Sequence, residues 1–286
     1  MGVYAITGSA SGMGRAVADR LRADGHTVIG IDLREADVVA DLSTVHGRKL
    51  AVREVLAAAG DRLDGAVFAA GLGPAPGRER PRLIAEVNFF GVVDLLEGWR
   101  EALATSGNAK VVVFSSNSTT TTPAVPRRTV EAFLRGDAER AARSVRLFGK
   151  AAPAIIYAGS KIAVSRWVRR TAVRPEWAGA GIRLNALAPG AVMTPLLEEQ
   201  LSTPSEAKAV RSFPVPVGDF GDAGSLGDWV VFMLSDSAEF LCGSVIFVDG
   251  GSDAYFRADD WPRAVPLRRI VPYLRRFRQF RASPTS

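Results

Sequence analysis

Short, almost wholly apolar runs alternate with stretches of helical periodicity along most of this chain. We expect strands at 3–6, 27–31, 38–40, 65–70, 110–114, 182–188 and 244–248, with helices between most of them. A strand that is apolar on both faces is buried on both faces, which is typical of a parallel sheet covered by helices on each side. The alternation therefore predicts an α/β fold with one doubly wound parallel sheet of the Rossmann type.

Composition and charge separate a neutral body from a basic C-terminal extension. The chain has 286 residues, of which 47% are hydrophobic and 23% charged, as expected for a folded protein with a large core. Eight arginines and only two acidic residues follow position 256, so the extension carries the whole net charge of +6. We therefore divide the chain into a folded domain at 1–256 and a basic amphipathic extension at 257–286. Because the body has no basic excess, we expect no nucleic-acid partner.

Few residues are suited to disulfide or metal chemistry. Cys242 is the single cysteine, and His26 and His46 are the only histidines. We therefore expect no disulfide and no metal site. No apolar run approaches the roughly 18 residues that cross a bilayer, and the chain begins directly with its first strand rather than a leader pattern. These features predict a cytoplasmic protein.

A glycine-rich turn, Thr7-Gly8-Ser9-Ala10-Ser11-Gly12-Met13-Gly14, joins the first strand to the first helix. Glycines let a backbone approach a pyrophosphate closely, and the following helix directs its free N–H groups at the anion. Asp32 ends the second strand, where a carboxylate accepts both hydroxyls of an adenosine ribose and repels a 2′-phosphate. Arg34 could instead accept that phosphate. We favour NAD over NADP as the cofactor.

A tyrosine and a lysine stand four residues apart in Tyr157-Ala158-Gly159-Ser160-Lys161. On a helix these two side chains share a face, although such a pair taken alone is more often a solvated surface. A phenol has an ordinary pKa of about 10, and an ammonium about 5 Å away favours the phenolate by roughly 3 kcal/mol. We therefore expect Lys161 to lower the pKa of Tyr157 and to make it an acid/base group beside NAD.

Five motifs follow one another in the order of a known family. They are the glycine-rich turn, Asn88 in Val87-Asn88-Phe89-Phe90-Gly91, Ser116 in Phe114-Ser115-Ser116, the pair Tyr157 and Lys161, and Pro189-Gly190-Ala191-Val192-Met193-Thr194. Over residues 1 to 252 the chain resembles the short-chain dehydrogenase/reductase family. The resemblance implies a catalytic tetrad of Asn88, Ser116, Tyr157 and Lys161. Ser115 and Ser118 are expected to be cap or turn hydroxyls.

The same resemblance implies the residues that contact the dinucleotide. They are Gly8, Ser11, Gly12, Met13, Gly14, Asp32, Leu33, Asp41, Leu42, Ala70, Gly71, Tyr157, Lys161, Pro189, Gly190, Val192 and Thr194. The family usually has Asn-Asn-Ala-Gly after the fourth strand, whereas this chain has Ala69-Ala70-Gly71. The missing amides would remove polar anchoring of the sheet near the cofactor.

A narrower resemblance indicates the class of substrate. Asp41-Leu42-Ser43-Thr44, Ala70-Gly71-Leu72-Gly73-Pro74 and Thr194-Pro195-Leu196-Leu197 are similar to the bacterial 3α-hydroxysteroid dehydrogenase/carbonyl reductase branch, as is the long segment between Ser116 and Tyr157. The resemblance implies an oxidoreductase that interconverts a secondary alcohol and a ketone on a lipophilic substrate, such as a 3α-hydroxysteroid or an aryl or alkyl ketone. A 3-oxoacyl thioester reductase and a non-catalytic dinucleotide-binding sensor remain as alternatives.

Three further segments carry expectations of their own. The insertion at about 119–152 predicts one or two helices, broken near Gly136 and packed on the body. Since the family builds subunit interfaces from the helices beside it, the resemblance implies a homodimer or homotetramer. The apolar, proline-broken segment after Thr194, with Leu196, Leu197, Leu201 and Phe213, is either a lid or a packed surface helix.

The extension has the pattern of a basic amphipathic helix. Its apolar residues recur at helical spacing among arginines, and Pro272 interrupts the pattern. The apolar positions are Leu267, Ile270, Val271, Leu274 and Phe277. We favour docking on a neighbouring subunit, with contact to an anionic membrane surface as the alternative.

Overall fold

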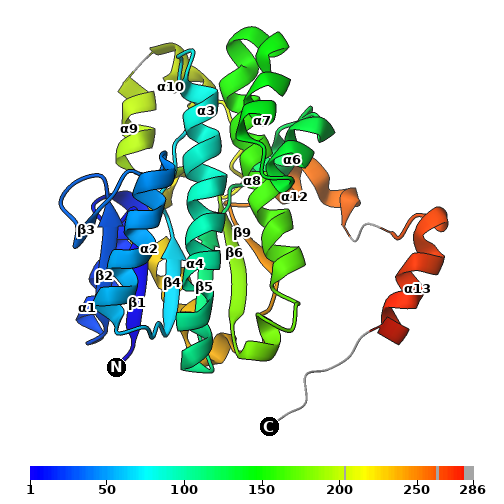
Figure 1. Cartoon of the computed structure of the whole chain (residues 1–286). Helices are drawn as coiled ribbons and strands as arrows, with labels where there is room; N and C mark the ends of the chain where they lie inside the picture. Colours follow the sequence, from blue (N-terminus) through cyan, green and yellow to red (C-terminus); the bar gives the residue numbers. More distant parts are fainter. Residues whose placement is uncertain (203, 262–263, 280–286) are drawn as a thin grey trace.

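A seven-stranded parallel sheet forms the centre of the molecule, in the order β3-β2-β1-β4-β5-β6-β9 (Figure 1). It is seen in a computed structural model that describes residues 1–202, 204–261 and 264–279. The strands are β1 (Val3–Thr7), β2 (Thr27–Asp32), β3 (Val38–Val39), β4 (Gly65–Phe68), β5 (Lys110–Phe114), β6 (Arg183–Pro189) and β9 (Val245–Val248). A separate short pair joins β7 (Val192–Met193) to β8 (Gly221–Asp222). The predicted Rossmann-type sheet is confirmed.

Helices cover both faces of this sheet. On one face α1 (Gly12–Ala23) packs against α11 (Ala223–Leu234), and the opposite face carries α2, α4 and α8. The bounds of these and neighbouring helices are α2 (Val45–Ala59), α3 (Arg80–Ala85), the π-helix η1 (Glu86–Phe90), α4 (Gly91–Ser106), α5 (Ser118–Thr121), α6 (Arg127–Leu134), α7 (Ala138–Ser144), η2 (Arg146–Ala151) and α8 (Ala152–Thr171). Two helices follow β7, namely α9 (Pro195–Ser202) and α10 (Pro204–Arg211).

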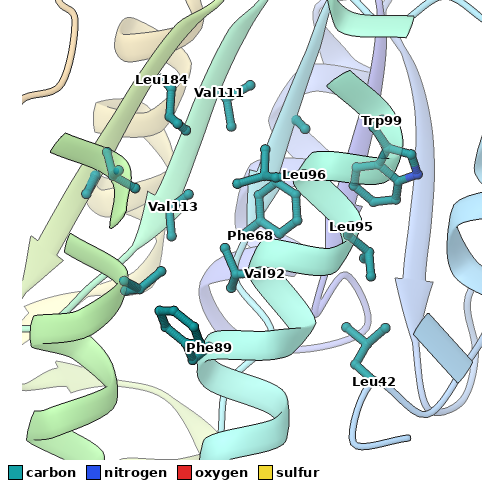
Figure 2. Packing of buried hydrophobic residues seen from close by; sticks show 14 of the residues in the cluster. Leu42, Phe68, Phe89, Val92, Leu95, Leu96, Trp99, Val111, Val113 and Leu184 are labelled. Carbon is teal, nitrogen blue, oxygen red and sulfur yellow. The ribbon is translucent and has the colours of Figure 1, made fainter. Parts of the chain in front are cut away.

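Side chains of alternate strand residues enter two separate hydrophobic clusters. Phe68 and Val113 belong to the cluster that α4 covers, and the ring centroid of Phe68 lies 5.5 Å from that of Trp99 (Figure 2). Their neighbours Val67 and Val112 lie in the cluster on the other side, beneath α1 and α11. Successive strand residues point to opposite faces of the sheet, and helices bury both faces. Both sets of strand side chains are therefore apolar, so the strands are apolar throughout.

The strand order places a crevice at the carboxyl edge of the sheet. From β1 the chain proceeds outward to β2 and β3, then returns across the sheet to β4 on the other side of β1. Ligands of open α/β sheets bind outside the carboxyl ends of the strands, at the point where the order reverses. This point lies between β1 and β4, beside the glycine-rich turn.

A π-helical turn interrupts the long helical segment that runs from Arg80 to Ser106. The sequence predicts one α-helix over 83–103, but the structure has α3, the π-helix η1 and α4 in succession. Asn88 lies in the middle of η1, where its side chain bonds to the backbone of Leu72. Single π-turns inside α-helices are frequent at functional sites, because they redirect side chains.

The insertion after Ser116 contains α6 and α7, which meet at Gly136, where φ is +79°. Phe133 of α6 is fully buried and lies 5.3 Å, between ring centroids, from Phe89 in η1. Together, α6 and α7 pack on α3 and α8. The insertion therefore supports α3, which leads directly into η1 and Asn88, and α8, which carries Tyr157 and Lys161.

In the described part of the extension, η5 (Ala258–Asp260), η6 (Leu267–Arg269) and α13 (Ile270–Gln279) follow α12 (Ser252–Arg257). Pro272 lies in the first turn of α13, where its missing N–H removes no helical hydrogen bond. Helix α13 therefore includes Pro272, although this residue interrupts the apolar pattern of the sequence, while the side chain of Phe277 lies outside the described residues. No helix within the described ranges has the length and apolar character needed to cross a bilayer.

Candidate active site

Two adjoining cavities open at the carboxyl edge of the sheet. The first, of about 480 Å³, lies beside the glycine-rich turn and the ends of β2 and β4. The second, of about 620 Å³, lies beside β5 and α8. Met13, Gly71, Leu72 and Thr194 line both cavities, so they form one continuous site with two compartments.

The first cavity brings together most of the residues expected to contact the dinucleotide. They are Gly8, Ser11, Gly12, Met13, Gly14, Asp32, Leu33, Asp41, Leu42, Ala70, Gly71 and Thr194. Sequence reasoning missed Arg80, Leu83 and Val87, which line the opposite wall. Arg80 donates two hydrogen bonds to the carbonyl of Gly73. Arg80 and Leu83 belong to no motif, and Val87 only precedes Asn88 in its motif. The placement of α3 and η1 at the cavity is therefore what identifies the three residues.

The glycine-rich turn is folded too tightly for other residues. Gly8 and Gly12 have φ of +72° and +52°, a region that favours glycine. A Cβ on Gly14 would lie 2.1 Å from the carbonyl oxygen of Gly8. Helix α1 therefore begins directly against the turn, and its first N–H groups border an open cradle. This geometry fits a pyrophosphate.

Asp32 ends β2 at the wall of the first cavity. One carboxylate oxygen accepts a hydrogen bond from the N–H of Ala10 at 3.0 Å, and the other accepts one from the N–H of Leu33 at 2.7 Å. The carboxylate is thus held beside the turn, where a ribose diol can reach it. Arg34 is not among the residues that line either cavity. The donor and acceptor set fits a dinucleotide without a 2′-phosphate.

A buried arginine connects two walls of the first cavity. Arg48 of α2 is 4% exposed and donates through Nη1 to the carbonyl of Leu42 and to Glu86, each at 3.0 Å. Its Nε donates to Asp94 at 2.7 Å. Leu42 belongs to one wall, while Glu86 begins the π-helix whose Val87 belongs to the other. Sequence reasoning missed Arg48, because its partners lie up to 46 positions away.

The second cavity brings together three members of the predicted tetrad. Ser116, Tyr157 and Lys161 line it, together with Pro189, Gly190, Val192 and Thr194. Asn88 lines neither cavity and is only 1% exposed. Its Oδ1 accepts from the N–H of Leu72 at 2.7 Å, and its Nδ2 donates to the carbonyl of Leu72 at 3.0 Å. Asn88 therefore anchors the loop after β4. This chain lacks the two asparagines that the family usually has at the start of that loop.

Helix α8 places Tyr157 and Lys161 on the same face, as the spacing predicts. The Lys161 Nζ lies 6.0 Å from the centroid of the Tyr157 ring and donates to the carbonyl of Phe114 at 2.7 Å. Ser115 is not the predicted turn hydroxyl, since its Oγ lies 2.7 Å from that of Ser165 in α8. This hydrogen bond joins the segment after β5 to α8. It thereby fixes the position of Ser116 relative to Tyr157 and Lys161.

Burial changes the pKa values of the acid/base pair. Burial raises the pKa of Tyr157 above its ordinary value, and a hydrogen bond with Ser116 offsets only part of that change. Burial also lowers the pKa of Lys161 to about 8. The expected lowering of the Tyr157 pKa by Lys161 is therefore wrong for this structure. Loss of solvation disfavours both charged forms and outweighs their mutual attraction.

Apolar side chains border the outer part of the second cavity. Leu197 of α9, Val210 of α10 and Phe213 line it from above, and Pro74 and Ala154 line it from the sides. The side chain of Leu196 lies outside the described residues. The segment after Thr194 thus forms helices that border the second cavity, and their side chains that line it are apolar.

Comparison with known proteins assigns the class of protein. Residues 4–190 match the NAD dependent epimerase/dehydratase family, and residues 141–253 match a family described as enoyl-(acyl carrier protein) reductase. With the relatives below, these matches show that the chain belongs to the short-chain dehydrogenase/reductase family. It is an NAD(P)-dependent oxidoreductase of that family.

Three relatives are similar over nearly their whole length. The 3-alpha-hydroxysteroid dehydrogenase/carbonyl reductase of Comamonas testosteroni is 36% identical over 257 residues, covering 90% of this chain and 98% of that protein. The crystal structure of the 3-alpha-hydroxysteroid dehydrogenase from Pseudomonas sp. B-0831, complexed with NADH, has a TM-score of 0.84 and 44% identity. The match covers 91% of this chain and all of that one. Levodione reductase of Leifsonia aquatica is 28% identical over 89% of this chain and 95% of its own length.

Proposed function

We propose that this chain interconverts a secondary alcohol and a ketone with NAD, on a lipophilic substrate such as a 3α-hydroxysteroid or an aryl or alkyl ketone. One observation carries the proposal. Ser116, Tyr157 and Lys161 line an apolar compartment of about 620 Å³ that adjoins the compartment beside the glycine-rich turn. A compartment of this size suits a small organic ligand that is mostly apolar with one reacting oxygen.

The chain's own side chains handle the proton and the substrate oxygen. A bound nicotinamide supplies the hydride acceptor for oxidation or the hydride donor for reduction. In oxidation, Tyr157 takes the proton of the substrate hydroxyl as hydride leaves the carbon. In reduction, it returns that proton to the oxygen. Ser116 donates a hydrogen bond to the oxygen where charge develops.

Lys161 and Asn88 act beside this exchange. The Lys161 ammonium would hold a nicotinamide ribose hydroxyl. Together with the positive charge of a bound nicotinamide, it would favour the phenolate of Tyr157, whose pKa burial alone raises. Asn88 keeps the Leu72 backbone in place, and a Cβ on Gly71 would lie 3.5 Å from its Oδ1 and 3.8 Å from the Lys161 Nζ. A proton path from Lys161 toward Asn88 would therefore pass close to Gly71.

The first compartment would hold the remainder of NAD. The glycines at 8, 12 and 14 would contact the pyrophosphate, and Asp32 would accept the adenosine ribose hydroxyls. Asp41, Leu42 and Leu33 would flank the adenine, while Val192 and Thr194 would hold the carboxamide. NADP would bring a phosphate toward the carboxylate of Asp32, and this repulsion supports NAD as the preferred cofactor.

Absorbance of NADH tests the proposal directly. Purified chain is mixed with NAD and a panel of hydroxysteroids, or with NADH and aryl ketones, and a 3-oxoacyl thioester is added as the alternative substrate. We expect turnover on hydroxysteroids or ketones and a loss of roughly 10²–10⁴-fold in kcat for Tyr157→Phe. NADH binding without turnover of any substrate would instead identify the chain as a non-catalytic dinucleotide sensor. Turnover of the thioester alone would contradict the lipophilic ketone.

We further propose a homodimer or homotetramer that works in the cytoplasm. The catalytic unit would comprise 1–256, and 257–286 would be an appendage to it. Solution mass by light scattering tests the assembly, and a monomer at micromolar concentration would contradict it.

A further inference from the structure

The last described helix exposes an apolar stripe. Leu267 is 86% exposed and Leu274 is 54% exposed, and Ile270 and Val271 are exposed as well. Spacings of three and four residues place these four side chains on one side of η6 and α13. Isolated exposed leucines need no explanation, but a continuous stripe on one helix marks a surface that contacts something else.

Arginines flank this stripe, and no acidic residue balances them. Arg268, Arg269, Arg275 and Arg276 are exposed on η6 and α13. From Trp261 to the end of the chain there are seven arginines and no aspartate or glutamate. The stripe therefore lies on a strongly cationic element, while residues 1–256 have equal numbers of acidic and basic groups.

The cationic helix stands apart from the catalytic body. Figure 1 shows α13 beyond α12, away from the layers of the fold. The two hydroxysteroid dehydrogenases are matched over 98% and 100% of their own lengths, yet about a tenth of this chain has no counterpart in them. The extension at 257–286 is about a tenth of the chain. The two relatives are therefore matched over nearly their whole length by a part of this chain that is as long as the body.

We propose that α13 lies on an anionic phospholipid surface. Its apolar stripe would enter the boundary between headgroups and acyl chains, and its arginines would contact the lipid phosphates. Basic amphipathic helices bind membranes by combining these two contributions, and each basic residue near the surface adds to the affinity. A second copy of the chain is a poorer partner, because its body has no net negative charge and its own extension is also cationic.

Vesicle co-sedimentation tests the surface on the full chain. Equal parts of phosphatidylglycerol and phosphatidylcholine make the anionic vesicles, and phosphatidylcholine alone makes the neutral ones. We expect the chain to pellet with the anionic vesicles only, and added salt to release it. Arg275→Gln with Arg276→Gln should lower the partition coefficient by roughly tenfold or more, because both charges are near the surface.

Matched variants separate the apolar contribution from charge and from folding. Ile270→Ala with Leu274→Ala keeps a high helix propensity and should also weaken vesicle binding by at least roughly tenfold. Arg15→Gln with Arg53→Gln removes the same charge from the exposed surface of the body and should leave binding unchanged. All of these variants should keep wild-type turnover on a water-soluble ketone, since no altered residue lines the active-site cavities.

Three results would overturn the proposal. They are equal pelleting with neutral and anionic vesicles, full binding by the Ile270→Ala, Leu274→Ala variant, and no binding by the wild-type chain. If the wild-type chain does not bind vesicles, the solution mass of the Ile270→Ala, Leu274→Ala variant becomes informative. A smaller mass for this variant than for wild type would assign the apolar stripe to contact between copies of the chain.

Discussion

Lys161 is buried and Tyr157 is partly buried beside it, and the loss of solvation changes the pKa values of both side chains. Water stabilises the phenolate and the ammonium far better than the interior does, so both side chains favour their neutral forms. The single carbonyl of Phe114 satisfies one proton of Lys161 but supplies no countercharge. Near neutral pH Tyr157 is therefore a phenol, while Lys161, with a pKa of about 8, is mostly an ammonium.

The pKa of Lys161 predicts how the stability of the protein changes with pH. Below pH 8 the amine is protonated in both the folded and the unfolded chain, whereas between about 8 and 10.5 only the unfolded chain is protonated. The unfolded state then binds more protons, so the unfolding free energy rises with pH across this window. The unfolding free energy of Lys161→Met should not rise in this way. The difference in unfolding free energy between wild type and this variant should therefore grow by on the order of 3 kcal/mol across the window.

Urea unfolding at a series of pH values, without nucleotide, measures this difference. Lys49→Met removes an exposed lysine and serves as the control, whose curve should run parallel to that of wild type. Parallel curves for wild type and Lys161→Met would show that Lys161 keeps an ordinary pKa.

We expect Asp32 to determine the choice between the two dinucleotides. Asp32→Asn keeps a side-chain oxygen that can accept from one N–H but removes the charge that repels a 2′-phosphate. We expect NAD affinity to fall by roughly tenfold or more, as charge-assisted hydrogen bonds are lost, and NADP affinity to rise. Dissociation constants from NADH and NADPH fluorescence measure both changes. Asp19→Asn, an exposed change on α1, is the control, and an unchanged ratio in Asp32→Asn would contradict the role of the carboxylate.

Among the elements, the π-helix η1 and helix α2 together shape the first cavity. Thr44 caps α2 by accepting from the N–H of Gly47, and it donates to the carbonyl of Asp41. A Cβ on Gly47 would lie 2.0 Å from that same carbonyl oxygen, so the helix begins in direct contact with the loop. Arg48 then joins the loop to η1. The wall formed by Asp41 and Leu42 is therefore held by backbone contacts and one guanidinium.

Removal of that guanidinium should weaken both the fold and the nucleotide site. Arg48→Met leaves Glu86 and Asp94 without their partner and frees the carbonyl of Leu42. We expect a loss of roughly 3 kcal/mol in unfolding free energy, because breaking a buried ion pair strands its charges. NADH affinity should fall as well, since the Leu42 wall is released. Urea unfolding and fluorescence titration measure the two effects.

Arg53→Met provides a control on the same helix, because Arg53 is exposed and pairs only with its neighbour Glu54. Exposed ion pairs contribute little, so this variant should resemble wild type in both measurements. If Arg48→Met also resembles wild type in unfolding free energy and NADH affinity, the contacts of Arg48 between the two cavity walls stabilise neither the fold nor the nucleotide site.

At the scale of the whole molecule, nucleotide binding and folding are linked through the carboxyl edge of the sheet. The first cavity draws on β1, β2, β4, α1 and η1, which come together only in the folded chain. NADH at a hundredfold excess over its dissociation constant should therefore stabilise the fold by about 2.7 kcal/mol. The melting temperature, followed by tryptophan fluorescence, should rise by several degrees. NADPH at the same concentration should raise it less, and equal shifts would contradict the preference for NAD.

The sequence by itself determined the sheet, the glycine-rich turn and the shared helix face of Tyr157 and Lys161. Apolar runs, helical periods and motif spacing are local patterns, and the backbone converts them directly into strands, turns and helix faces. Thus the spacing of Tyr157 and Lys161 predicted one shared face, and Asp32 was expected at the end of its strand. The structure has both arrangements.

Only the tertiary structure decided how those residues are supported and charged. The bond between Ser115 and Ser165, the three partners of Arg48 and the position of Asn88 behind the cavity all join segments distant in sequence. The pKa of Tyr157 likewise depends on how much of the fold surrounds it, and burial reversed the direction expected from its nearest cation. Local spacing determines which side chains can meet, whereas solvation and long-range packing exist only after the chain has folded.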